Sequence, residues 1–246
     1  MTGKKGSGDN AYIYLPPYSK SGFAAGTIPA GEQGFVISGS FPDGPQVFLN
    51  ELQSAFLKES LQIKGGFRTI NRDFIPAPQV SGNSKLITIE SPPLDSLNYW
   101  FLKKSINLYG EALLKIMAFN KTKTGSTDEG VEIVKDYWEK SGIDRTAINI
   151  IDGSGLSPQN RVTTYALVRV LQYAKTRPWF SSFNYSLPEY NGMKMKSGSI
   201  GGSRSFAGYH TSASGKEYAF AIIVNNYDGS SSAMVRKLYQ VLDVLK

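Results

Sequence analysis

The sequence has no cysteine and a single histidine, and these absences rule out several kinds of site. None of its 246 residues is cysteine, and the one histidine is His210. Disulfides, thiol catalysis and zinc sites with cysteine ligands are therefore excluded. A histidine-based metal cluster is excluded as well, and a Ser-His-Asp triad would depend on His210, which we interpret as structural or solvent-facing. We expect a hydrolase built on this chain to use lysine as its base.

Long hydrophobic runs and clusters of a single charge are also missing. No apolar stretch approaches the roughly 20 residues that a transmembrane helix needs, and no signal-peptide pattern is visible. The formal net charge is +7, but the lysines and arginines are scattered along the chain. Such a distribution favours steering of anionic partners and does not indicate a nucleic-acid surface. We therefore predict no membrane span and no nucleic-acid partner.

The hydrophobic pattern changes along the chain and predicts a mixed architecture. Residues 11–41, with 34–40 among them, are typical of short strands and turns because they are rich in Gly, Pro and aromatics. Apolar residues at helical spacing predict the following helices: 45–64, 94–119 with a break at 103–105, 128–141, 163–176 and 230–246. Short strands are predicted at 86–89 and 147–151, and a loop at 178–191.

Alternating residues near the end of the chain predict an antiparallel sheet. The ranges 196–200, 205–211 and 217–226 alternate between apolar and polar residues and are separated by short turns. The apolar stripe of 230–246 is expected to pack on this sheet. With the helices that precede the strands, this order predicts a layered helix–sheet–helix domain of the α+β class.

The first of these strands carries a polar cluster suited to holding a carboxylate. Lys196 supplies charge, Ser197 and Ser199 supply hydroxyl donors, and Gly198 lets a ligand backbone come close. Taken alone, the cluster is more typical of an ordinary strand that begins with Ser and Gly. A second Lys-Thr-Gly sequence, at 123–125, lies in a polar stretch without alternation, and we interpret it as a solvated loop.

Two further motifs precede this strand, and the order of the three suggests a family. Ser105 and Asn107 stand at an expected helix boundary, where a capping serine is the plain alternative. Residues 152–157 read Asp-Gly-Ser-Gly-Leu-Ser. Together with the Lys-Ser-Gly strand and Ala-Gly-Tyr at 207–209, these motifs resemble the serine-type D-alanyl-D-alanine carboxypeptidases of the penicillin-binding protein 4 (peptidase S13) family. That family lies in the penicillin-binding protein and serine β-lactamase superfamily, which uses Ser-x-x-Lys, Ser-x-Asn and Lys-Thr/Ser-Gly elements.

The resemblance runs from about residue 8 to the C-terminus and carries expectations about fold and activity. It implies a β-lactamase/transpeptidase-like domain that is incomplete at its N-terminus. Residues 1–45 would be a remnant of an inserted β-rich domain, and 46–246 the C-terminal part of the catalytic domain. The implied reaction is acyl transfer on peptidoglycan stem peptides ending in D-Ala-D-Ala, in the periplasm or cell envelope, with β-lactams as substrate mimics. No metal or organic cofactor is expected.

The resemblance also assigns catalytic roles to three residues of this chain. Ser105 would relay a proton toward the leaving amine. Asn107 would bond the substrate amide and the neighbouring lysine, and Lys196 would supply positive potential to the terminal carboxylate.

Five more residues are assigned to substrate binding by the same resemblance. Ser197 and Ser199 would hydrogen-bond the carboxylate, and the N–H of Ser199 would form half of an oxyanion hole. Gly198 completes this strand motif. Ser154 and Leu156 represent the loop at 152–157.

The sequence departs from the family pattern in three places. No serine has a lysine three positions later, so the nucleophile element is missing. Gly110 replaces the alanine usual before Glu111, which we read as a minor change, and Pro158 stands where an arginine often follows. We expect a fragment that begins inside an insertion and is inactive alone. The alternative is a non-catalytic peptidoglycan- or partner-binding protein with the same fold.

Overall fold

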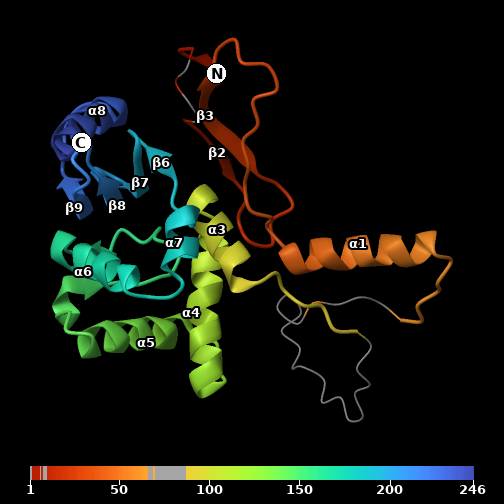
Figure 1. Cartoon of the computed structure of the whole chain (residues 1–246). Coiled ribbons are helices and arrows are strands. Elements are labelled where there is room, and N and C mark those ends of the chain that lie inside the picture. Colours follow the sequence, from red (N-terminus) through yellow and green to blue (C-terminus); the bar gives the residue numbers. More distant parts are fainter. Residues whose placement is uncertain (1, 6, 8–9, 66–68, 70–86) are drawn as a thin grey trace. The chain divides into compact units, whose positions relative to one another are not determined.

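The computed structural model describes residues 2–5, 7, 10–65, 69 and 87–246 and divides at residue 87 into two units (Figure 1). The first unit holds a three-stranded sheet of order β1-β3-β2, with β1 at Thr2–Gly3, β2 at Asn10–Tyr14 and β3 at Phe23–Pro29. Its helix α1, Gly44–Lys58, begins after Asp43, whose side chain accepts a hydrogen bond from the Gln46 N–H at 3.1 Å. This cap explains why the helix starts where the sequence predicts it.

The second unit, Thr88–Lys246, contains the other predicted helices and the late strands. Its elements are α3 (Leu94–Lys104), α4 (Asn107–Thr122), α5 (Thr127–Lys140), η1 (Arg145–Ala147), β4 (Ile148–Asn149), β5 (Arg161–Val162), α6 (Thr164–Lys175), α7 (Phe180–Ser186), β6 (Glu189–Tyr190), β7 (Met193–Ile200), β8 (Ser203–Thr211), β9 (Glu217–Asn225), α8 (Ser231–Leu242) and η2 (Asp243–Leu245). Strands β6 to β9 form an antiparallel sheet in chain order, and β4 pairs with β5.

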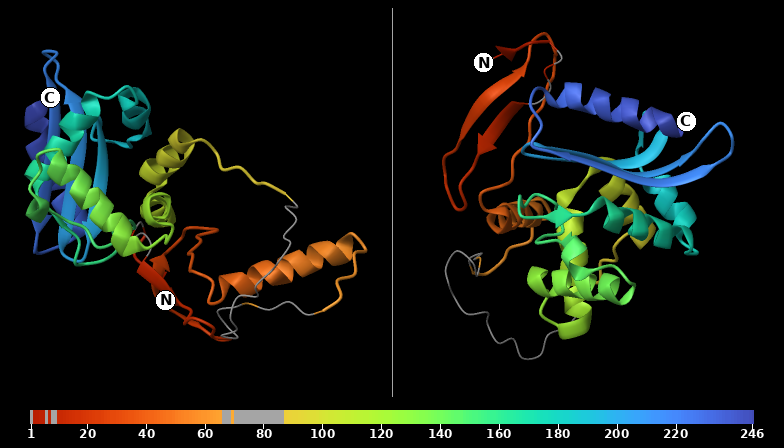
Figure 2. Two further views of the ribbon diagram at one scale, coloured as in Figure 1. Left: turned by 90° about the horizontal axis from the view of Figure 1, so that it is seen from below. Right: turned by 90° about the vertical axis from the view of Figure 1, so that its left-hand side faces the viewer.

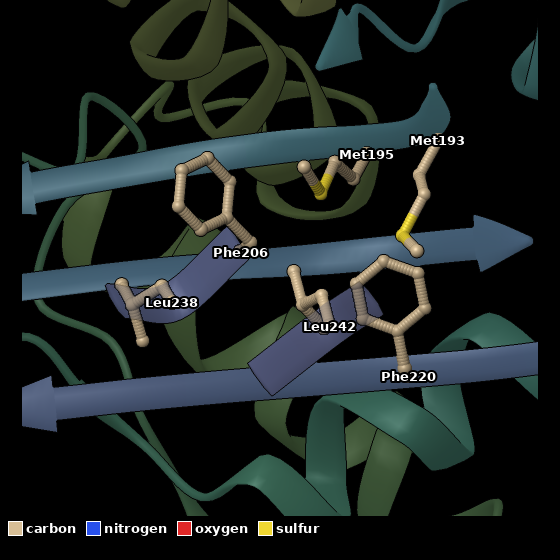
Figure 3. Close-up of a cluster of buried hydrophobic side chains, with 6 residues drawn as sticks. All are labelled: Met193, Met195, Phe206, Phe220, Leu238 and Leu242. Carbon is tan, nitrogen blue, oxygen red and sulfur yellow. The ribbon is translucent and has the colours of Figure 1, made fainter. Parts of the chain in front are cut away.

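Helix α8 covers one face of the four-stranded sheet. Alternation along β7 sends Met193 and Met195 to this face, where both are almost fully buried. Figure 3 shows them beside the aromatic rings of β8 and β9 and two leucines of α8; the cluster comprises Met193, Met195, Phe206, Phe220, Leu238 and Leu242. The predicted packing of the C-terminal helix on the three strands is confirmed.

The opposite face of the sheet packs against α6 and α7, so the sheet lies between two helical layers (Figure 2, right). Leu171 of α6 and Leu187, just after α7, are buried with Tyr209 of β8. The Tyr209 hydroxyl donates to the Leu171 carbonyl at 2.7 Å, which satisfies the one polar atom of that ring. This layering is the predicted α+β arrangement.

Some local predictions are wrong. The expected loop at 178–191 contains α7 and β6, because Phe180 and Phe183 pack on Tyr209 and tertiary burial stabilises a short helix. Residues 34–40 and 87–89 form no strand, and residue 86 lies outside the described part. The strand expected at 147–151 is limited to Ile148–Asn149.

Two other expectations concern a decoy motif and a domain boundary. Lys123 ends α4 in the left-handed conformation and residues 124–125 follow it outside any strand, so the loop interpretation of 123–125 is confirmed. The assignment of residues 1–45 to an inserted domain remains a prediction. Among the described residues no helix combines the length and apolarity needed to cross a bilayer.

Candidate active site

A sharp turn between α3 and α4 positions Ser105. Helix α3 ends at Lys104, and α4 begins at Asn107. Ser105 has φ 51° and ψ 48°, the left-handed region that non-glycine residues adopt only at a cost of about 1–3 kcal/mol. Such backbone conformations persist where surrounding contacts hold them, and they cluster at functional sites. The break expected at 103–105 is confirmed, and it turns out to be a strained corner.

The Asn107 side chain ties this corner to the loop between β4 and β5. With its NH2 group facing the acceptors around it, Asn107 donates to the Ser154 carbonyl at 3.0 Å and to the Ser105 carbonyl at 3.3 Å. The first residue of α4 thus holds the Ser-x-Asn motif and the 152–157 loop together.

Glu111, one helical turn further along α4, binds the backbone of the same loop. One oxygen of its carboxylate accepts the backbone N–H of Gly153 at 2.8 Å and that of Ser154 at 3.0 Å. Two backbone donors converging on a carboxylate make charge-assisted hydrogen bonds, which are among the stronger ones. The spacing from Asn107 to Glu111 places both side chains on one helix face.

Asp152 organises the loop from within. Its carboxylate accepts the N–H of Gly155 at 2.6 Å, the N–H of Ser157 at 2.8 Å and the side-chain amide of Asn160 at 3.1 Å. Burial opposes ionisation, but the hydrogen bonds from Asn160, Ser157 and Gly155 outweigh it, so the pKa of Asp152 is lowered. The loop is therefore built around a carboxylate that stays ionised at neutral pH.

The backbones of α4 and the loop touch at a pair of glycines. A Cβ on Gly110 would lie 1.9 Å from the Gly153 carbonyl oxygen, and a Cβ on Gly153 would lie 2.2 Å from the Gly110 carbonyl oxygen. Neither side chain could be added without moving one backbone away from the other. The sequence analysis treated the replacement of alanine by Gly110 as a minor change. In the structure, the missing side chain at this position permits the close contact.

Lys196 of β7 reaches the corner from the sheet. Its Nζ donates a hydrogen bond to the Ser105 Oγ, joining two motifs that are 91 residues apart in the sequence. Burial lowers the pKa of Lys196 below its ordinary value. The expectation that Ser105 Oγ and Lys196 Nζ lie within hydrogen-bond reach is met. Their catalytic roles remain a prediction.

Beyond Lys194, the outer edge of β7 has no partner strand among the described residues, because β6 pairs only with residues 193 and 194. The Met195 N–H donates to the Pro188 carbonyl at 2.9 Å and so points toward this edge. Since backbone groups alternate along a strand, those of Ser197 and Ser199 point the same way. Within the described part of the chain, the sheet therefore presents backbone donors and acceptors without a strand partner beside Lys196.

The side chains of this strand divide between the two faces. Lys196 and Gly198 share the face opposite α8, whereas alternation turns Ser197 and Ser199 toward the α8 face. A Cβ on Gly198 would lie 2.4 Å from the Ser205 Oγ, so this glycine also makes room for a side chain of β8. The hydroxyls of the two serines therefore lie on the face away from Lys196. What the serines offer at the open edge is their backbone N–H and C=O groups.

The structure therefore brings together most of the residues that the sequence singled out. Ser105, Asn107, Ser154 and Lys196 are joined by the hydrogen bonds described above. Leu156 lies in the same loop and is 65% exposed. Within the described ranges no group of three or more His, Cys, Asp or Glu residues could hold a metal. A hydroxyl that receives a hydrogen bond from a lysine, beside an open strand edge, can relay protons and hold an anion.

Sequence reasoning missed the supporting role of Glu111. The sequence analysis named this residue only as the one that follows Gly110 and gave it no function. Its spacing of four residues from Asn107 was the available signal, because that spacing puts both side chains over the same loop.

Comparison with known proteins is consistent with this geometry. The model of the D-Ala-D-Ala carboxypeptidase 3 (S13) family matches residues 23–192, more than half of the chain. A D-alanyl-D-alanine carboxypeptidase of Actinomadura sp. (strain R39) is 25% identical over 260 residues, covering 96% of this chain and 47% of that protein. The D-alanyl-D-alanine carboxypeptidase DacB of Haemophilus influenzae is 30% identical over 156 residues, covering 56% of this chain and 33% of that protein.

A solved structure supports the fold. Penicillin binding protein 4 (dacB) from Haemophilus influenzae, complexed with a β-lactam, superposes with a TM-score of 0.72 at 22% identity, covering 98% of this chain and 60% of that one. The chain thus spans less than half the length of these two curated relatives. The match of the family model over 23–192 decides the classification: the chain belongs to the D-Ala-D-Ala carboxypeptidase 3 (S13) family.

Proposed function

We propose that this chain supplies the carboxylate-binding and proton-relay half of a serine-type D-Ala-D-Ala carboxypeptidase/endopeptidase site acting on peptidoglycan stem peptides. The observation that carries this proposal is the hydrogen bond from Lys196 to Ser105 at the open edge of β7. It unites the Ser-x-Asn and Lys-Ser-Gly motifs at one point of the second unit.

The open edge suits the end of a stem peptide. An extended peptide can add to an unpaired strand through main-chain hydrogen bonds. The Ser199 N–H, which points out of this edge, would serve as one donor of an oxyanion hole. The Lys196 ammonium lies next to this edge and would attract the terminal carboxylate, with the outward-pointing Ser197 N–H as a further donor.

The contact between Lys196 and Ser105 favours proton relay. An ammonium is a donor only, so when it donates to the Ser105 Oγ the hydroxyl hydrogen is directed elsewhere. In the proposed reaction this hydrogen passes to the amine of the departing D-alanine as the C–N bond breaks, and the Lys196 ammonium gives a proton to the Ser105 oxygen in its place. Asn107, which fixes the Ser105 corner to Ser154, would also bond the substrate amide.

The nucleophile would come from a Ser-x-x-Lys segment outside this sequence, in which no serine has that spacing. A cavity of about 580 Å³ between α3, α5, α6 and α7 would accept apolar side chains of such a segment. Its lining includes Leu94, Phe101, Val170, Trp179 and Phe183. The full-length parent would work in the periplasm or cell envelope, where peptidoglycan is found.

We expect this chain alone to form no covalent adduct with a labelled penicillin and to release no D-alanine from a stem-peptide analogue. The reason is that carboxylate binding cannot replace an activated nucleophile, whose loss costs on the order of 10⁴-fold or more in rate. Intact-protein mass spectrometry after penicillin treatment is the measurement. A stoichiometric adduct on Ser105 or another serine of this chain would show that the nucleophile is wrongly assigned.

The absence of Ser-x-x-Lys from the sequence also favours a second candidate function, a non-catalytic peptidoglycan- or partner-binding protein with this fold. Co-expression with a Ser-x-x-Lys segment taken from a family member separates the two. Recovery of penicillin labelling supports the enzyme, whereas stem-peptide binding without any labelling supports the binding protein.

A further inference from the structure

Lys103 makes a long-range contact that neither the motifs nor the proposed reaction uses. This residue lies in the last turn of α3, two positions before Ser105. Its Nζ donates to the Leu187 carbonyl at 2.6 Å, across 84 positions of sequence. Leu187 is 2% exposed and lies between α7 and β6. The contact therefore attaches the end of α3 to the segment that enters the four-stranded sheet.

This contact closes a ring of interactions around the site. Residue 188 follows Leu187, and its carbonyl accepts the Met195 N–H at 2.9 Å. Lys196 comes next on β7 and donates to the Ser105 Oγ. The backbone joins Ser105 to Lys103, which lies two positions earlier in the sequence. Two long-range hydrogen bonds complete the ring, the one from Lys196 to Ser105 and the one from Lys103 to the Leu187 carbonyl.

The ammonium of Lys103 is held by the Leu187 carbonyl and lies 5.9 Å from the centre of the Tyr99 ring on the same helix. Burial lowers the pKa of Lys103, the charge of Lys194 lowers it further, and Glu189 acts in the opposite direction. The ammonium nevertheless donates to the carbonyl of a buried residue, and no hydrogen bond joins it to Ser105 or Lys196 among the described residues. It therefore stands outside the group of side chains that would touch a substrate.

We infer that Lys103 is a positioning residue: by binding the Leu187 carbonyl it holds the left-handed Ser105 corner against Lys196. A strained corner needs contacts on more than one side to persist. The Asn107 bonds fix its α4 side and the Lys103 bond fixes its α3 side. The positioning role rests on the proposed function, but its physical content, the placement of Lys196 beside Ser105, can be measured without a substrate.

The test compares Lys103→Met with Lys103→Arg and Lys104→Met in the whole chain. Methionine keeps the apolar stem but removes the donors, arginine keeps charge and donors, and Lys104 is an exposed neighbour. The first readout is the pKa of Lys196, measured without ligand by a pH titration of the ¹³C-labelled lysines in NMR spectra. The second is the affinity for N-acetyl-D-Ala-D-Ala.

In Lys103→Met, Lys196 is expected to lose its burial against Ser105, so its pKa rises toward the ordinary lysine value. The affinity for the dipeptide falls roughly 10- to 100-fold, as misplaced binding groups generally cause. Lys103→Arg restores both quantities substantially, and Lys104→Met leaves both unchanged. A Lys103→Met protein that folds and keeps both quantities overturns the inference.

The two readouts separate failure of this inference from failure of the proposed function. If the parent chain binds no dipeptide, the proposed function is contradicted. A raised Lys196 pKa in Lys103→Met would still support the positioning role of Lys103. If Lys103→Met does not fold, Lys103→Gln carries the same expectation, because glutamine stays polar but is too short to span the contact.

Discussion

The Gly153→Ala variant is expected to destabilise the second unit by about 3 kcal/mol, at the upper end of what overpacking usually costs. The added Cβ would lie 2.2 Å from the carbonyl oxygen of Gly110 and 2.9 Å from the backbone nitrogen of Glu111. Because these atoms belong to the backbone of α4, the clash cannot be relieved by a side-chain rotation. The loop must move off the helix and lose its two hydrogen bonds to Glu111.

Urea denaturation followed by tryptophan fluorescence measures this effect cleanly. The three tryptophans of the chain, at 100, 138 and 179, all lie in the second unit. Gly201→Ala is the matched control, because a Cβ at Gly201 meets nothing within 4 Å. We expect the free energy of unfolding of the control to lie within about 0.5 kcal/mol of that of the parent chain. Equal free energies of unfolding for the two variants would contradict the close backbone contact between α4 and the loop.

Lys196→Met is expected to weaken binding of N-acetyl-D-Ala-D-Ala roughly 10- to 100-fold, the usual worth of a hydrogen bond to a charged group. Methionine retains much of the length and the apolar stem of lysine but removes the ammonium. The Ser105 hydroxyl would lose its donor as well. Lys194→Met serves as control, because Lys194 lies on the same strand and forms an ion pair with Glu189 at 3.5 Å.

The pH dependence gives this prediction a sign. A bound carboxylate favours the ammonium form and raises the pKa of Lys196, so affinity is constant below the ligand-free pKa and falls above it. Burial lowers that ligand-free pKa below 10.5, and the decline should begin at correspondingly lower pH. Calorimetric titrations between about pH 7 and pH 10 measure it. A flat profile in the parent chain, or a decline that persists in Lys196→Met, would contradict the role of Lys196.

Much of this architecture could be predicted because it follows local periodicity. Alternation in the late strands and the apolar stripe of α8 each encode one buried face, and the structure uses those faces as expected. The helix α7 could not be predicted from its polar, aromatic sequence. It forms because Phe180 and Phe183 find Tyr209, a residue distant in sequence that periodicity does not identify.

The site shows the same division. Motif residues such as Ser105 and Lys196 could be chosen from their chemistry and their order along the chain. The supporting contacts of Lys103 and Glu111 depend on which carbonyl or N–H the fold brings within reach. The orientation of Ser197 and Ser199 likewise follows from the register of β7 with β8, which composition does not specify.

The most direct test of the proposed carboxylate-binding edge is an amide NMR titration of the whole chain with N-acetyl-D-Ala-D-Ala and with its L,L isomer. We expect the D,D dipeptide to shift the amides of Ser197 and Ser199 saturably, because these groups point out of the open edge beside Lys196. The L,L isomer should bind more weakly, since its side chains project differently from the same backbone contacts. Shifts confined to other parts of the chain, or equal affinity for the two isomers, would contradict the account.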